Sequence, residues 1–120
     1  MQDRFKFRVW NKENNKLYTW EEITNKKGYC SLYWCMLQAQ NNEKNNILMQ
    51  CTGLKDKNGK LIYEGDIVKD YCIDYITVVE WRKAEYALKS KYYGYIGFNT
   101  PEQKIIGNIY ENKDLLNEQL

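Results

Sequence analysis

The chain has 120 residues, 18 of them basic and 16 acidic, with a formal net charge of +2 and no histidine. This length fits one domain, so we expect a single domain over residues 1–120. The missing histidine excludes Ser-His-Asp and Cys-His catalysis within one chain and removes the commonest zinc ligand. Because basic and acidic residues nearly balance, the chain lacks the large excess of positive charge that drives non-specific DNA binding.

Eleven tyrosines and four tryptophans stand against one proline and seven glycines, a composition that favours ordered β-sheet. No apolar run approaches the roughly 20 residues that span a bilayer, and the first residues lack the apolar core of a signal peptide. We therefore expect a cytoplasmic protein that makes no contact with membranes.

The elements begin with a predicted N-terminal hairpin. Residues 5–9 alternate apolar and basic side chains, which is typical of a strand with one buried face. A polar turn over residues 11–16 leads to a return strand at 17–20. The mixed pattern of residues 21–40 fits either an irregular strand or a short helix. The Asn-, Gln-, Glu- and Lys-rich run at 38–46 predicts an exposed loop.

Six further strands are predicted, separated by turn residues, with a short helical turn at residues 112–118. The strands cover residues 47–52, 61–63, 67–71, 75–81, 93–98 and 105–110. Gly107 inside the last strand predicts a bulge or a close backbone approach. Short strands at this spacing indicate a mainly β fold, either a small barrel or a strongly bent antiparallel sheet, with little helix.

The hydrophobic core is predicted from the alternation in the N-terminal strand and from the apolar runs that follow each turn. Its members are Phe5, Phe7, Val9, Ile67, Val79 and Ile109.

Two turn signals lie between these strands. Asn58-Gly59 predicts a hairpin with a type I′ turn, in which both central residues need positive φ. At Glu64-Gly65-Asp66 the chain turns again, and Asp66 is expected to accept hydrogen bonds from backbone amides. The alternative is that these two carboxylates act on a substrate or a metal, but neighbours on one tight turn lack the opposed geometry of acid–base catalysis.

The four cysteines, Cys30, Cys35, Cys51 and Cys72, are separated too unevenly for the close pairs of a Cys₄ zinc site. Cys51 and Cys72 lie in apolar, strand-like runs, where a thiol behaves as a small hydrophobe. We expect reduced structural thiols and no bound metal, with a zinc site as the alternative.

Motifs in three segments span nearly the whole chain. They are FKFRVWN (5–11) with KLY (16–18), MQCTGLKDKNGK (49–60) with IYEGDIV (62–68), and IGNIYEN (106–112) with LL (115–116). In these motifs and their order, the chain resembles the YopX family of phage and prophage proteins. It departs from the family pattern at Cys51, usually aromatic, and at Lys113, often proline. The resemblance implies a phage or prophage origin, a bacterial host cytoplasm and an SH3-like, mostly β architecture, with no catalytic, cofactor-binding or metal-binding residues to carry over.

The function expected from the sequence is that of a non-enzymatic accessory protein that binds a protein or a nucleic acid. The expected contact surface is an aromatic and basic stretch, comprising Trp81, Arg82, Lys83, Tyr86, Lys89, Lys91, Tyr92 and Tyr93. Such residues can stack on single-stranded bases while the basic groups follow the phosphates. The alternative for this stretch is that Tyr86 and Leu88 belong to the core and the lysines form a solvated loop. The alternatives for the whole chain are self-assembly into a dimer or ring and a histidine-free enzyme.

Overall fold

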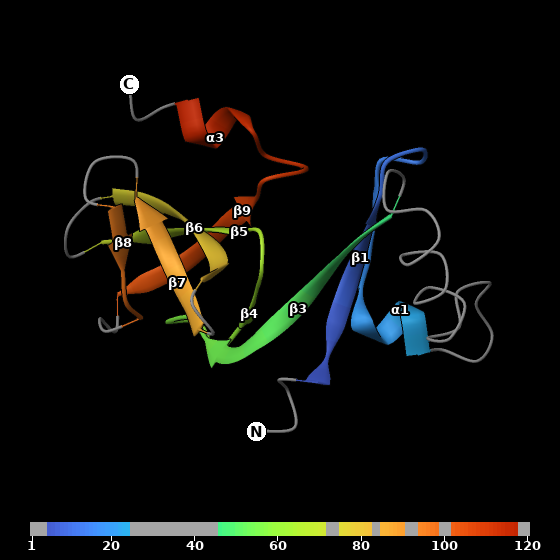
Figure 1. The fold of residues 1–120 in the computed structure, drawn as a ribbon, viewed down its shortest axis with the longest axis horizontal. Helices are drawn as coiled ribbons and strands as arrows, with labels where there is room; N and C mark the ends of the chain where they lie inside the picture. Colours follow the sequence, from blue (N-terminus) through green and yellow to red (C-terminus); the bar gives the residue numbers. More distant parts are fainter. Residues whose placement is uncertain are drawn as a thin grey trace. The chain divides into compact units, whose positions relative to one another are not determined.

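The computed structural model describes residues 5–24, 46–71, 75–82, 85–90, 94–98 and 102–117. The chain divides into two compact units, Met1–Cys51 and Thr52–Leu120. In the described ranges both units consist mainly of antiparallel strands (Figure 1), so the predicted mainly β fold with little helix is confirmed. The two helices within these ranges are each too short to cross a membrane. The single domain over residues 1–120 stays a prediction.

The first unit contains the predicted N-terminal hairpin. Strand β1 (Phe7–Asn11) pairs antiparallel with β2 (Lys16–Tyr18) on one side and with the first half of β3 (Asn46–Lys55) on the other. Val9 lies in a small core with Ile23 of helix α1 (Trp20–Thr24), and half-buried Phe7 and Tyr18 pack against this core. The alternation in β1 therefore places one face of the hairpin under the helix.

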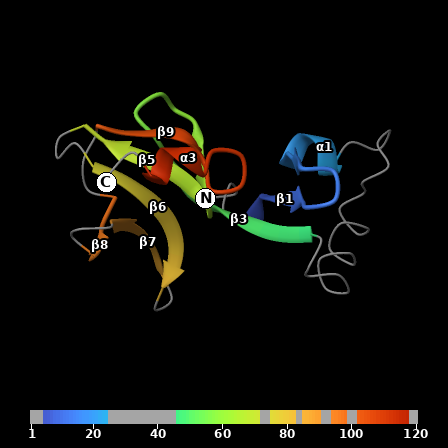
Figure 2. The same ribbon diagram turned by 90° about the horizontal axis from the view of Figure 1, so that it is seen from above.

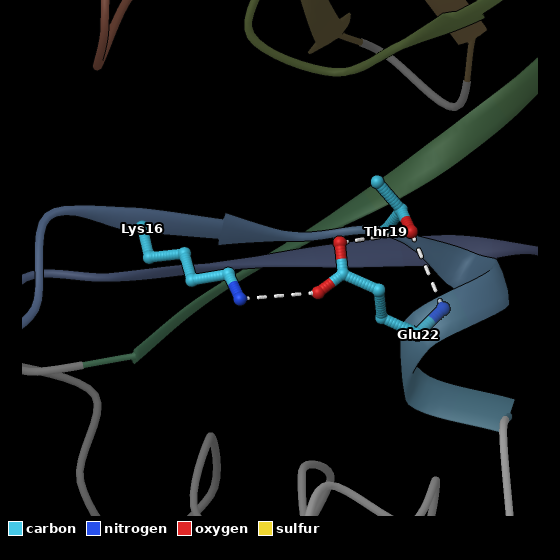
Figure 3. Close-up of polar contacts among 3 residues, drawn as sticks. All are labelled: Lys16, Thr19 and Glu22. Carbon is cyan, nitrogen blue, oxygen red and sulfur yellow. Dashed lines mark hydrogen bonds and ion pairs between the residues drawn. The ribbon is translucent and has the colours of Figure 1, made fainter. Parts of the chain in front are cut away.

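Helix α1 begins after Thr19, whose side chain caps it (Figure 3). The Thr19 hydroxyl accepts the backbone N–H of Glu22 at 3.2 Å and donates to the Glu22 carboxylate at 3.3 Å. Lys16 Nζ lies 3.3 Å from the other oxygen of that carboxylate. This capping arrangement explains why a helix begins where the sequence left helix and strand open. Residues 25–45 lie outside the described ranges, and most of the loop predicted at 38–46 lies with them.

The second unit contains a five-stranded antiparallel sheet with the order β8-β7-β6-β5-β9. The strands are β5 (Asp66–Asp70), β6 (Tyr75–Arg82), β7 (Glu85–Ser90), β8 (Gly94–Ile96) and β9 (Gln103–Asn108). Figures 1 and 2 show from two directions that the sheet is strongly curled, as predicted. Strand β4 (Leu61–Tyr63) pairs with β3, and helix α3 (Asp114–Asn117) follows β9.

The core of this unit lies on one face of the curled sheet. Ile62 of β4 packs there with Val68, Val79 and Leu88, and Tyr86, Ile96, Phe98 and Ile105 surround them. Among the predicted core residues, Val9, Ile67 and Val79 are buried, while Phe7 and Ile109 are half-buried. The prediction for Phe5 is wrong: 74% of the side chain is exposed, because β1 begins only at Phe7 and its alternation does not reach Phe5.

Strand β7 is the one strand in the described ranges that the sequence analysis did not predict. Its register pairs Val79 with Leu88 and Trp81 with Tyr86. Glu85 and Lys89 fit the two-residue period on the outer face, but the core face offers only two large apolar side chains, Tyr86 and Leu88, before buried Ser90, so the pattern is too short to indicate a strand.

The turn between β3 and β4 is wider than predicted, and the type I′ assignment is wrong. Gly59 has a positive φ of 81°, but Asn58 does not, and a type I′ turn requires both. The N–H of Gly59 donates to the carbonyl of Asp56, and the N–H of Asp56 donates to the carbonyl of Lys60. The hairpin therefore has a three-residue loop, 57–59, with glycine at the left-handed position.

Candidate binding surface

Trp81 is the most exposed aromatic side chain of the second unit's described residues, with 56% of its surface accessible. It lies near the end of β6, on the same face as buried Val79, and pairs across the sheet with Tyr86. The two rings meet edge to face, with centroids 4.7 Å apart and planes at 68°. Tyr86 also packs against the core. The exposed Trp81 ring is therefore supported from behind by Tyr86, and both residues lie on paired strands.

Arg82 lies on the opposite face of the same hairpin. Its guanidinium carbon is 4.0 Å from the centroid of the Tyr95 ring, and the Tyr95 hydroxyl donates to Glu80 at 3.1 Å. Glu85 is the cross-strand partner of Arg82, and Lys89 is the partner of Tyr95. The described charges on this face are thus two basic and two acidic groups, so no positive excess accumulates there.

The stretch predicted as a contact surface is therefore divided by the two-residue period of β6 and β7. Trp81 and Tyr86 lie on the core face, whereas Arg82 and Lys89 lie on the other. Lys83, Lys91, Tyr92 and Tyr93 lie outside the described residues. Leu88 is fully buried and Tyr86 packs against the core, which agrees with part of the alternative interpretation. The structure brings together the two rings and separates them from the described charges.

The carboxylates of the glycine-rich motif hold turns together. Asp66 is 2% exposed, and its Oδ2 accepts the N–H of Tyr63 at 2.8 Å. The predicted hydrogen bond from a backbone amide to Asp66 is therefore confirmed. Gly65 has a φ of 81°, and its N–H donates to the carbonyl of Val79. This turn is thereby fastened to β6, which accounts for its glycine and its aspartate in structural terms.

Asp56 ties the β3–β4 loop to strand β9. Its Oδ1 accepts the N–H groups of Asn58 and Lys60, both at 2.9 Å, and its Oδ2 accepts the N–H of Ile105 at 3.0 Å. Burial raises the pKa of this carboxyl, but hydrogen bonds from these three amides and the charge of Lys60 outweigh burial. The net pKa lies below the ordinary value of 3.8, so Asp56 is a charged structural anchor at neutral pH.

The motif after β9 also has a structural explanation. The register between β5 and β9 shifts beside Gly107, and a Cβ at Gly107 would lie 2.5 Å from Asn112 Oδ1. That oxygen accepts the N–H of Asn108, while Asn108 Oδ1 accepts the N–H groups of Tyr110 and Glu111. The predicted close approach at Gly107 is confirmed, and the register shift falls at its neighbour Ile106. The asparagine side chains accept hydrogen bonds from the backbone N–H groups of this loop.

A basic and aromatic cluster that the sequence analysis missed lies around Tyr71, which is 47% exposed. The ammonium groups of Lys57 and Lys69 lie 5.4 and 5.0 Å from the centroid of its ring. Lys104 of β9 is the cross-strand partner of Lys69. We name Lys57, Lys69, Tyr71 and Lys104 the Tyr71 cluster. Because its members come from three separate segments, the only signal in the sequence is the pair Lys69 and Tyr71, two residues apart at the end of β5.

In the described part of the chain, no three Cys, Asp or Glu side chains gather in a manner that could hold a metal ion. Cys51 is a buried thiol in β3, as expected for a small hydrophobe. Cys30, Cys35 and Cys72 lie outside the described residues, and the prediction that the cysteines bind no metal stays a prediction.

Comparisons with known proteins agree with the motifs. The model of the family described as YopX protein matches residues 6–117. The fold is similar to the crystal structure of protein EF1440 from Enterococcus faecalis, with a TM-score of 0.62 and 23% identity, covering 92% of this chain and 96% of that one. It is also similar to the crystal structure of protein yopX from Bacillus subtilis, with a TM-score of 0.61 and 20% identity, covering 94% and 96%. No curated protein matches the chain. The chain belongs to the YopX protein family.

Proposed function

We propose that this chain is a non-enzymatic binding module whose main contact is a protein partner anchored on Trp81 and Tyr86. The observation that carries the proposal is the exposure of Trp81 on two paired strands, with its ring supported by Tyr86 and the core behind it. Rigid, exposed tryptophan and tyrosine side chains are typical anchors of protein interfaces. A ring that is already held in place loses little conformational freedom on binding.

The charges of the described residues in this hairpin favour a protein over a nucleic acid. Phosphates would meet Glu80 and Glu85 beside Arg82 on the face opposite Trp81, and carboxylates repel a phosphate backbone. A protein surface can complement such a mixture of charges group by group. The rings on the core face supply apolar contact, which is what the centre of a protein interface needs.

The absence of enzymatic activity is also part of the proposal. Asp56 and Asp66 each accept hydrogen bonds from backbone amides, a role that leaves the two carboxylates engaged in the fold. From the resemblance to the family, we further propose that the protein has an SH3-like fold, is encoded by a phage or prophage and acts in the cytoplasm of the bacterial host.

The test compares three baits in a lysate of the organism that carries the gene. The parent chain, Trp81→Ala and Tyr95→Ala are immobilised, and the bound proteins are quantified by mass spectrometry. Tyr95 is a matched control, because it is also an exposed aromatic residue of this sheet but lies on the opposite face. We expect a partner that the parent and Tyr95→Ala recover and Trp81→Ala does not.

Calorimetry with the purified partner then measures the dissociation constant for the parent and for each variant. Trp81→Ala removes an anchor residue and should raise the dissociation constant by about tenfold or more. Tyr95→Ala should change it little. Equal recovery by all three baits would contradict the proposal. If light scattering shows a dimer that Trp81→Ala dissociates, the partner is a second copy of the chain, and self-assembly replaces a separate protein.

A further inference from the structure

The Tyr71 cluster is a second surface whose chemistry differs from that of Trp81. Its three lysines come from the β3–β4 loop, from β5 and from β9, and two of them contact the same exposed ring. Asp70 pairs with Tyr75 at the start of β6, whereas Trp81 lies six residues further along that strand. At the rise of a β-strand this separation is about 20 Å, so one small contact cannot cover both surfaces.

The lysines are positioned by the backbone framework of the unit. The N–H of Lys57 donates to the carbonyl of Gln103 at 2.9 Å, and the Asp56 carboxylate beside it accepts the N–H of Ile105. These bonds dock the loop onto β9 next to Lys104. The N–H of Tyr71 donates to the carbonyl of Glu102, so the backbone of Tyr71 is held beside β9.

This arrangement brings positively charged side chains close together. Lys69 and Lys104 are direct cross-strand partners, and like charges in that position destabilise a sheet. Glu102 offsets part of the charge through an ion pair of 3.2 Å with Lys57. At the surface, the described cluster with Glu102 contains three basic groups and one acidic group, while the neighbouring carboxylates of Asp56 and Asp70 are buried.

We propose that the Tyr71 cluster binds single-stranded nucleic acid through its phosphate backbone, with the Tyr71 ring available to an unpaired base. Lysines around an exposed aromatic ring provide both of the contacts that such ligands require. The surface charge here contrasts with the balance among the described charges around Arg82, so we place the nucleic-acid contact at this part of the sheet instead of at residues 81–93. The proposal does not depend on the protein partner at Trp81.

The test is a fluorescence-anisotropy titration of the full chain with labelled oligothymidylate at two salt concentrations. We compare the parent with a triple variant, Lys57→Gln, Lys69→Gln and Lys104→Gln. A control variant, Lys12→Gln, Lys55→Gln and Lys113→Gln, loses the same charge at three exposed lysines outside the cluster. We expect the cluster variant to bind about tenfold more weakly, and its salt slope to fall by about 2, because each single-strand phosphate contact contributes roughly 0.7. The control should keep most of the parent's affinity.

Lys104→Glu separates loss of binding from loss of folding. It replaces the like-charged pair with an opposite-charged pair, so its melting temperature should equal or exceed that of the parent while oligothymidylate binding is weakened. Equal affinities of the cluster and control variants would overturn the proposal. So would the absence of binding by the parent at micromolar concentration in low salt.

Two further probes test the class of ligand. A duplex of matched length should bind more weakly than the single strand, because its paired bases cannot stack on Tyr71, and equal binding would contradict the single-strand preference. If polyglutamate binds as tightly as oligothymidylate and depends on the same lysines, the site accepts an acidic polypeptide and the nucleic-acid proposal is wrong.

Discussion

Gly59 has a φ of 81°, a conformation that costs an L-residue roughly 1–2 kcal/mol. A Cβ at this position would meet no atom within 4 Å, so strain in the backbone should account for the whole effect of a substitution. We expect Gly59→Val to lower the free energy of unfolding by about 1–2 kcal/mol in urea denaturation. Asn58→Val is the matched control, since Asn58 does not have positive φ. Equal losses at the two positions would show that the loop geometry is different.

Asp56 provides a residue-scale prediction that depends on pH. Its folded pKa is depressed, so the carboxylate adds stability above the unfolded pKa of about 3.9, and this stability is lost as pH falls through the folded pKa. Asp56→Asn places an amide where Ile105 needs an acceptor, and should cost about 1–3 kcal/mol near neutral pH. Urea denaturation at neutral and acidic pH should show a smaller difference between parent and variant in acid. A difference independent of pH would contradict this role, and Asp114→Asn serves as an exposed control.

At the scale of elements, the loop after β9 contains a testable coupling. Gly107→Ala should cost about 1–3 kcal/mol, because its Cβ would overlap the Asn112 side chain that accepts the Asn108 N–H. In an Asn112→Gly background this overlap is absent, so the added cost of Gly107→Ala should be smaller by at least about 0.5 kcal/mol. A double-mutant cycle measured by chemical denaturation checks this. Strict additivity would mean that the two side chains do not compete for the same space.

Local signals explain why most elements were predictable from sequence. Alternation in β1 and the turn residues around β4 and β5 depend on neighbours in the chain, and Asp66 and Gly107 have the roles that those signals indicate. Strand β7 was missed because only Tyr86 and Leu88 show its two-residue period, which is too short a pattern to indicate a strand. The width of the loop at Asn58 depends on the Asp56 carboxylate, which is a contact that dipeptide preferences do not include.

The candidate sites were less predictable for the same reason. The sequence concentrated rings and basic residues at 81–93, but the strand period places Trp81 and Arg82 on opposite faces. The Tyr71 cluster combines Lys57, Lys69 and Lys104, and its assembly depends on sheet order and on a loop docked by backbone hydrogen bonds. Neighbouring residues in the sequence were separated, and distant residues were brought together.

At the scale of the whole molecule, we propose two independent binding surfaces on one curled sheet, an aromatic surface at Trp81 and a basic surface at Tyr71. The most direct test is a crossed experiment in which the Trp81→Ala variant and the triple lysine variant are each assayed for partner capture and for oligothymidylate binding. We expect Trp81→Ala to lose the protein partner and keep the oligonucleotide, and the lysine variant to do the reverse. Loss of both activities in either variant, with the fold intact by circular dichroism, would contradict two independent surfaces.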